Sequence, residues 1–245
     1  MQISFFEEFP TNRNLSKLKL VKWPTILYIA AKSIMEFNRI RSGIKNKKVK
    51  QIVYWPILKN KDGYWISPFS RRKALLKIFN ELSEKKMPIM IDAELPTTRN
   101  PWLYFSEMFN FFRNKKLIRN FIYKHNAYVC EYCPEGRREA VLSLIGLHFK
   151  PVRFKIIKML YHSMHHYTRH FIINTLKSGK KKYNKKYIAA FGTIAKGIHR
   201  NEPILSYKTL KQDLQVAKKA GVNEVIIYRL GGLNKKYAQI IEECL

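Results

Sequence analysis

Eight short apolar runs, rich in β-branched and aromatic residues, recur along the chain, and longer amphipathic stretches separate most of them. Runs with apolar side chains at nearly every position suit strands buried on both faces, as in a parallel sheet covered by helices. The expected strands are 3–6, 25–30, 51–56, 88–91, 127–132, 154–161, 187–192 and 224–230. Apolar residues at helical spacing predict helices over 71–85, 102–124 and 206–220, and Gly221 stands where a left-handed helix end is expected.

Eight strand–helix units in 245 residues fit the α/β class and, within it, a closed (β/α)8 TIM-type barrel. An open doubly wound sheet is the competing architecture, but no Gly-rich phosphate turn follows the first run. No break in composition marks a second domain. We therefore expect residues 1–245 to form a single TIM-barrel-like domain, with the basic segment 38–50 as a connection.

The charge is strongly unbalanced, with 47 Lys and Arg residues against 17 Asp and Glu and a formal net charge of +30. Such a charge attracts anions, including nucleic acid, anionic lipid and acidic polymers, although lysine-rich solvated helices give the same composition. The sequence begins without a signal peptide pattern, and no apolar run approaches the roughly 20 residues of a membrane span. Three cysteines do not make a disulfide framework. We expect a cytoplasmic protein without a transmembrane segment.

Acidic residues gather at the ends of the expected strands, where barrels of this type build their active sites. Five of the 17 acids lie there, namely Glu7, Glu8, Asp92, Glu94 and Glu131. Other polar and aromatic residues at strand ends are Tyr54, Trp55, Lys158, Tyr161, His162, Thr193, Lys196 and Arg229. The alternative role for such acids is to cap the following helix or to pair with a lysine.

Clustered carboxylates beside aromatic rings suit a carbohydrate substrate. A carboxyl group crowded by others and partly buried has a raised pKa, so it can deliver a proton to a leaving oxygen near neutral pH. We expect Glu94 to be this proton donor and Asp92 to orient it or tune its charge. Glu131, Glu7 or Glu8 would supply a base or nucleophile, and the rings near Tyr54 and Trp55 a stacking surface.

A known family shares part of this pattern. The strand ending Ile91-Asp92-Ala93-Glu94 resembles the last half of the DxxDxDxE signature of family-18, chitinase-like glycoside hydrolases, and Lys158-Met159-Leu160-Tyr161 is similar to their M-x-Y strand. The resemblance implies a TIM barrel in which Glu94 protonates the glycosidic oxygen. It also implies that Asp92 orients the substrate's N-acetyl group, which acts as the internal nucleophile, and that Tyr161 assists this N-acetyl group. Met87 and Met90 replace the two earlier aspartates of the signature.

Other motifs leave alternatives open. Lys158 or Lys196 could act as an amine catalyst in a lyase, aldolase or isomerase for a phosphorylated sugar, with Gly231 and Gly232 near its phosphate. A catalytically inactive basic barrel could bind an anionic partner such as nucleic acid, and 177–186 is the densest basic run.

Metal and redox sites have weaker support. On a helix, His162, His166 and His170 would share one face, but no HExxH pattern is present. Cys130 and Cys133 lack a second pair at ligand spacing. The sequence therefore predicts a glycoside-hydrolase-like enzyme that acts on a carbohydrate or sugar phosphate through strand-end carboxylates, without a metal or cofactor.

Overall fold

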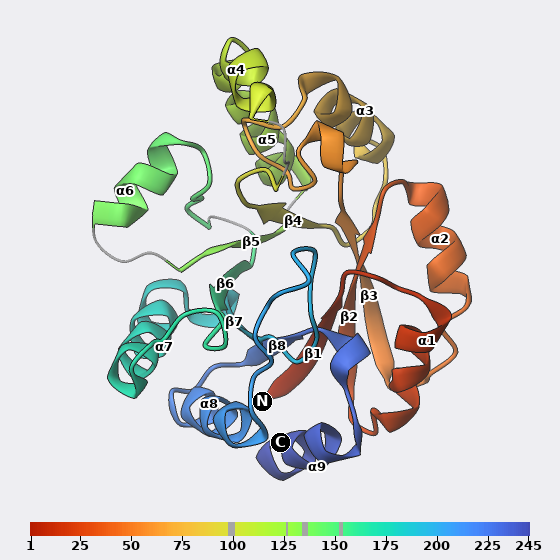
Figure 1. The fold of residues 1–245 in the computed structure, drawn as a ribbon, viewed down its shortest axis with the longest axis vertical. Coiled ribbons are helices and arrows are strands. Elements are labelled where there is room, and N and C mark those ends of the chain that lie inside the picture. The colour runs from red at the N-terminus through yellow and green to blue at the C-terminus, as the bar shows by residue number, and fades with distance from the viewer. Residues whose placement is uncertain (98–100, 126, 134–136, 152–153) are drawn as a thin grey trace. The chain divides into compact units, whose positions relative to one another are not determined.

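The computed structural model describes residues 1–245 except 98–100, 126, 134–136 and 152–153. Within this part of the chain, eight parallel strands alternate with helices in the pattern of a (β/α)8 barrel (Figure 1), which confirms the predicted fold class. The strand order is β3-β2-β1-β8-β7-β6-β5-β4. The strands are β1 (Gln2–Glu7), β2 (Thr25–Ala31), β3 (Val49–Pro56), β4 (Met90–Ala93), β5 (Tyr128–Tyr132), β6 (Ile156–Leu160), β7 (Tyr187–Gly192) and β8 (Glu224–Tyr228).

The two outer strands of this order, β3 and β4, meet through a single parallel bridge between Tyr54 and Ile89. The amide of Tyr54 donates to the carbonyl of Pro88 at 3.0 Å there. Most strand positions are buried, including all seven residues of β2 and all six of β7, whereas the first four residues of β3 are not. This burial explains why the strands read as continuous apolar runs rather than as alternating patterns.

Four of the described α-helices begin after a short polar side chain. Thr11, Thr168, Ser206 and Asn234 each accept a hydrogen bond from a backbone N–H in the first turn that follows, which satisfies a donor left free at a helix start. The α-helices are α1 (Asn12–Leu15), α2 (Ile34–Ser42), α3 (Arg72–Leu82), α4 (Trp102–Met108), α5 (Phe111–His125), α6 (Arg137–Leu144), α7 (Arg169–Tyr183), α8 (Tyr207–Lys219) and α9 (Lys235–Cys244). Short 3-10 turns are η1 (Ser16–Leu20), η2 (Asn60–Asp62), η3 (Asn184–Lys186) and η4 (Leu230–Gly232).

The predicted helix over 206–220 is confirmed as α8, and Gly221 follows it at φ +71°. The predicted helix over 102–124 is two helices, because the chain turns at Phe109 and Asn110 between α4 and α5. None of the described helices is long and apolar enough to cross a membrane.

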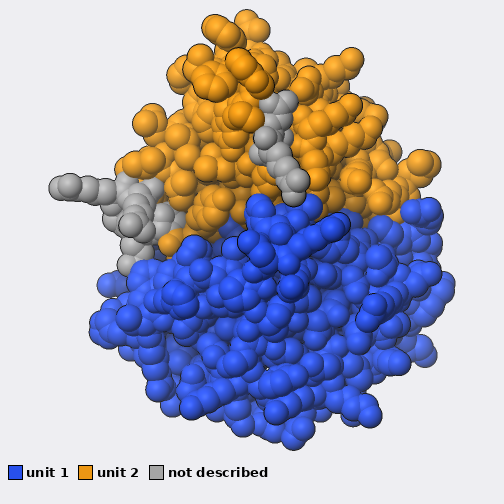
Figure 2. All heavy atoms as spheres, viewed as in Figure 1, with its two compact units in different colours: residues 1–30, 39–53, 157–245 blue, residues 31–38, 54–156 orange. Residues whose placement is uncertain are grey.

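The chain divides into two compact units (Figure 2). Unit 1 comprises residues 1–30, 39–53 and 157–245, and unit 2 comprises residues 31–38 and 54–156. In unit 1, α8 and α9 lie side by side (Figure 1). In unit 2, α3 packs on α5, with the rings of Phe79 and Phe121 stacked 4.3 Å apart. The organisation as a single domain stays a prediction.

Candidate active-site residues at the strand ends

Two carboxylates of unit 2 lie at the end of β4 and are linked to side chains of β5. The two strands pair in parallel, with Asp92 opposite Cys130. The Cys130 thiol donates to the buried Asp92 carboxylate, and burial, reinforced by that charge, raises the pKa of Cys130. Two residues further along, the Tyr132 hydroxyl donates to half-buried Glu94, and burial together with the Glu94 charge raises the pKa of Tyr132. Asp92 and Glu94 thus lie close together beside a thiol and a phenol.

Glu131 is not part of this group, because it pairs in register with Ala93 and alternation directs its side chain to the other face of the sheet. Its carboxylate is fully buried, lies 2.7 Å from Nδ1 of His148 and accepts from the backbone N–H of Phe149 at 3.0 Å. Nε2 of His148 lies 3.1 Å from a carboxylate oxygen of Glu139 on α6. Glu131 therefore ties β5 to α6 and the segment after it, which is a structural role rather than that of a base beside Glu94.

The aromatic residues expected to stack on a substrate are buried in the core of unit 2. Tyr54 packs against Phe37 with the ring centroids 4.8 Å apart, and burial raises the pKa of Tyr54. Trp55 stacks on Trp65 at 5.7 Å with the rings nearly parallel, and Tyr64 meets Trp65 edge-on. The indoles of both tryptophans are covered by the protein. Their faces are therefore used in packing.

In unit 1, the predicted binding residues Glu7 and Arg229 bind each other. One oxygen of fully buried Glu7 lies 2.9 Å from an Arg229 guanidinium nitrogen and also accepts from Phe9 N and Asn14 Nδ2, while the other accepts from Gly231 N at 2.6 Å. The rest of the guanidinium donates to the backbone carbonyl of Lys196. Burial raises the pKa of Glu7, and the positive charge of Arg229 opposes that shift.

These contacts bear on the expected phosphate site near Gly231 and Gly232. The amide of Gly231 is occupied by the Glu7 carboxylate, so the chain itself supplies the anion at this turn. A side chain on Gly232 would meet the backbone carbonyl oxygen of Ile194 at 1.8 Å, so its missing side chain lets two protein segments approach each other. The geometry is that of a tight strand-to-helix turn.

The other acid after β1, Glu8, belongs to a second group in unit 1. It is buried and accepts a hydrogen bond from the hydroxyl of Tyr228 at the end of β8. Tyr161, which follows β6, packs on Tyr228 with ring centroids 5.6 Å apart. Burial, reinforced by the Glu8 charge, raises the pKa of Tyr228. Sequence reasoning missed Tyr228, although it lies near the end of a predicted strand and beside Arg229. A role for Tyr161 toward a substrate stays a prediction.

The remaining predicted residues of unit 1 are dispersed. The Lys158 ammonium lies 6.0 Å from the ring centroid of Tyr183 at the end of α7, so it faces a helix. His162 Nδ1 lies 3.2 Å from buried Asp213 on α8. The hydroxyl of Thr193 donates to the carbonyl of Pro203, and Lys196 is exposed.

Asp213 is a second residue that sequence reasoning missed. Burial raises its pKa to about 6, with the His162 hydrogen bond acting in the opposite direction. A signal was present, because Asp213 occupies a position of the apolar stripe formed by Leu210, Leu214 and Ala217.

The helical arrangement considered for three histidines is wrong. His162 lies in a turn and His166 in irregular backbone, and α7 begins only at Arg169 after the capping residue Thr168. Because His170 alone of the three is helical, the three side chains do not follow a helical spacing. Among the described residues, no group of three or more metal-ligating side chains is placed to hold an ion.

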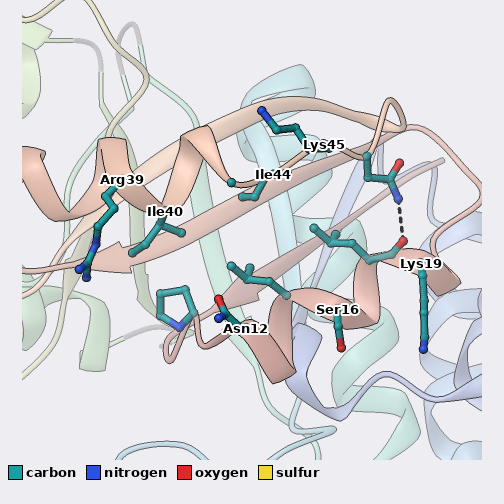
Figure 3. Close-up of a pocket in the computed structure, with 12 residues that line it drawn as sticks. Asn12, Ser16, Lys19, Arg39, Ile40, Ile44 and Lys45 are labelled. Carbon is teal, nitrogen blue, oxygen red and sulfur yellow. Dashed lines mark hydrogen bonds between the residues drawn. The ribbon is translucent and has the colours of Figure 1, made fainter.

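A cavity of ≈ 880 Å³ opens on unit 1 between α1 and η1 on one side and the end of α2 with the following turn on the other (Figure 3). Asn46 donates to the carbonyl of Leu18 across it at 2.6 Å. Lys19, Arg39 and Lys45 bring positive charge to its walls. None of the predicted site residues lines this cavity.

Comparison with known proteins supports the fold and not a family. No protein-family model matches the sequence, and no curated protein matches it. Among solved structures, the chain is similar to a D-tagatose 3-epimerase-like protein, with a TM-score of 0.55 and 14% identity over 100% of this chain and 97% of that one.

The Escherichia coli 3-keto-D-glucoside 4-epimerase gives a TM-score of 0.53 at 14% identity over 100% and 98% of the two chains. A class V chitinase from Nicotiana tobaccum gives 0.52 at 9% identity over 98% of each chain. The distant resemblance to chitinase barrels is therefore confirmed at the level of the fold.

Proposed function

We propose that this chain is a carbohydrate-acting enzyme of the glycoside-hydrolase type, with Glu94 as proton donor and Asp92 as its charged neighbour. The observation that carries the proposal is the pair of carboxylates at the end of β4, held by Cys130 and Tyr132 of β5. Active sites of parallel barrels lie at such strand ends. Additional support comes from the fold, which the chain shares with a chitinase and with a sugar epimerase.

The chemistry proposed for Glu94 is general acid catalysis. A protonated Glu94 transfers its proton to the glycosidic oxygen while the bond from that oxygen to the anomeric carbon breaks. The Tyr132 hydroxyl then donates to the resulting carboxylate, and a hydrogen bond to an ionised acceptor is stronger than one to a neutral acceptor. Asp92 has one of two roles in this step. Its negative charge stabilises the positive charge that develops on the sugar, or its carboxylate holds an N-acetyl group of the substrate that attacks the anomeric carbon.

The direct test compares Glu94→Gln with Glu84→Gln, because Glu84 is an exposed acid of the same unit. Release of reducing ends is measured from oligosaccharides with and without N-acetyl groups. Loss of a general acid lowers kcat on the order of 10²- to 10⁴-fold, whereas the control should keep full activity. Hydrolysis confined to N-acetylated substrates supports substrate assistance. Equal activity of the two variants overturns the assignment of Glu94.

A lysine-based enzyme has less support in the structure. The Lys158 ammonium faces the ring of Tyr183, and Lys196 is exposed, with its backbone carbonyl bound to Arg229. Borohydride trapping of a substrate imine on either lysine would nevertheless favour the sugar-phosphate alternative over hydrolysis.

A second candidate function is binding of a nucleic acid phosphate backbone in the cavity of Figure 3. The segments 10–22 and 39–50 that build it contain no acidic residue and ten basic ones, namely Arg13, Lys17, Lys19, Lys22, Arg39, Arg41, Lys45, Lys47, Lys48 and Lys50. Cations concentrated on one surface bind polyphosphates with strong salt dependence.

Its test replaces Lys19, Arg39 and Lys45 together by Glu. An equal change of charge at the exposed residues Lys208, Lys219 and Lys235, which lie outside the basic run 177–186 and outside the cavity, serves as the control. Weaker duplex binding in the first variant alone supports the cavity, and equal weakening in both shows attraction by net charge only.

A further inference from the structure

Helix α4 of unit 2 buries its charged residue and exposes large aromatic residues, whereas a surface helix usually does the opposite. Its inner face carries Leu103 and Glu107, both buried, and Glu107 accepts from the backbone N–H at the start of α3. Its outer face carries Trp102, Phe105 and, at the end of the helix, Phe109. These three side chains, at spacing i, i+3 and i+7, lie on one face and are 73%, 62% and 85% exposed. The charged residue of α4 is inside and its aromatic stripe faces outward.

Helix α5, which follows in the chain, adds a further exposed aromatic side chain. Phe112 is 79% exposed, and Lys116 and Arg119 follow it at i+4 and i+7, on the same face. Met108 and Arg113 are also exposed. Glu107, the one acid of residues 101–125, is buried, so no acidic side chain lies at the surface of these two helices. We call the aromatic part, Trp102, Phe105, Phe109 and Phe112, the aromatic ridge.

Isolated exposed apolar residues are ordinary, whereas a contiguous group of large aromatic side chains on one helix face indicates a surface that another body covers. The rings of Trp102 and Phe105 lie 5.8 Å apart, so part of the ridge is already a packed aromatic surface. Trp and Phe beside Lys and Arg are the composition of helices that lie in the headgroup region of a bilayer. Cations next to the apolar side chains suit the phosphates of anionic lipids.

We propose that the aromatic ridge of α4 and α5 inserts into the surface of an anionic membrane, with Arg113, Lys116 and Arg119 on the lipid phosphates. The protein would lie on the membrane in this arrangement. The rings enter the boundary between headgroups and acyl chains, and the cations remain at the level of the phosphates. This attachment is independent of the chemistry proposed for Glu94.

The position of the tryptophans provides the assay. Of the four tryptophans, Trp102 is exposed, whereas Trp23, Trp55 and Trp65 are buried. Intrinsic fluorescence therefore reports mainly on Trp102 when its surroundings change. Adding phosphatidylglycerol vesicles should shift the emission to the blue, and adding phosphatidylcholine vesicles should give a much smaller shift. Sedimentation with the vesicles measures the affinity of each variant.

Two triple variants separate the apolar and the electrostatic contributions. Phe105, Phe109 and Phe112 replaced by Ser should lower the affinity at least a hundredfold, whereas replacement by Leu should retain most of it. Neutralising the three cations with Gln should weaken binding on the order of 100-fold, at about fivefold for each charge. The same change at the exposed residues Lys208, Lys219 and Lys235, which lie outside the basic run 177–186, is the control and should have little effect.

Three outcomes overturn the proposal. The first is failure of the unmodified protein to bind phosphatidylglycerol vesicles. The second is vesicle binding that the Ser variant retains, because the attraction is then due to net charge alone. The third is a dimer in solution that the Ser variant abolishes while vesicle binding is absent, because the aromatic ridge is then an interface between two copies of this chain.

Discussion

Replacing Glu7 by Gln should destabilise the fold, although the two side chains have nearly the same shape. One Glu7 oxygen accepts from Phe9, Asn14 and Arg229, and the other accepts from Gly231. A glutamine can present its carbonyl oxygen to the first three donors. Its amide group then faces the Gly231 N–H, so one hydrogen bond is lost and two donors oppose each other. Arg229, which is largely buried, also loses its counterion.

The size of this effect follows from two opposing contributions. Removing one partner of a buried ion pair typically costs about 3–5 kcal/mol, because the remaining charge is left uncompensated. The raised pKa of Glu7 shows that burial disfavours its charged form, and a neutral glutamine avoids that penalty. Arg229 also keeps its hydrogen bonds to the Lys196 carbonyl. We therefore expect a loss of about 2–3 kcal/mol in the free energy of unfolding.

Urea denaturation at neutral pH, followed by circular dichroism, measures this loss. Glu243→Gln is the control, because Glu243 forms an exposed ion pair with Lys211, and it should leave the midpoint unchanged. Arg229→Gln alone and combined with Glu7→Gln completes a double-mutant cycle, which isolates the coupling between the two side chains. A change below about 0.5 kcal/mol for Glu7→Gln would refute the reasoning, since such a value is typical of a surface substitution.

Three further predictions concern stability. Burial raises the pKa of Asp213 from 3.8 to about 6 against the effect of His162, so the folded state holds a proton that the unfolded chain loses. The free energy of unfolding should therefore decrease as pH rises through this interval, and Asp213→Asn should remove that decrease in denaturant titrations. Gly232→Ala should cost at least about 2 kcal/mol, because the new methyl meets a carbonyl oxygen at 1.8 Å, whereas Gly43→Ala, with its nearest atom at 3.4 Å, should stay within roughly 0.5 kcal/mol. Glu131→Ala should lower Tm, since it leaves Nδ1 of buried His148 and the backbone N–H of Phe149 without the carboxylate that binds them.

The fold was predictable because burial on both faces leaves a direct record in the sequence. Every residue of β7 and β8 is buried, and both strands read as apolar runs. The break between α4 and α5 could not be predicted from the sequence. Phe109 and Asn110 stand at the break, and neither is glycine or proline, the residues that commonly indicate a helix end. The capping glycine after α8 was readable, since φ +71° at Gly221 is a conformation that other residues rarely adopt.

The candidate site was predictable only in part. The rule that barrel sites lie at strand ends selected Asp92 and Glu94, and the structure places them together beside Tyr132. The same rule selected Glu131, whose side chain faces the other way. Only the register between β4 and β5 shows that Glu131 faces away from Asp92. That register is set by tertiary pairing, so the local sequence does not reveal it. The partnership of Glu7 with Arg229 was equally hidden, because it joins residues far apart in the chain.

The pairing of β1 with β8 has a consequence for synthesis of the protein. Residues Gln2 to Phe6 pair in register with Glu224 to Tyr228, and the Ser4 hydroxyl donates to Glu224 across a separation of 220 residues. While translation proceeds, one edge of β1 lacks its partner until β8 emerges from the ribosome. An unpaired apolar strand edge is prone to aggregation, and such distant pairings form slowly. The nascent chain should therefore depend on chaperones that shield β1 until β8 arrives.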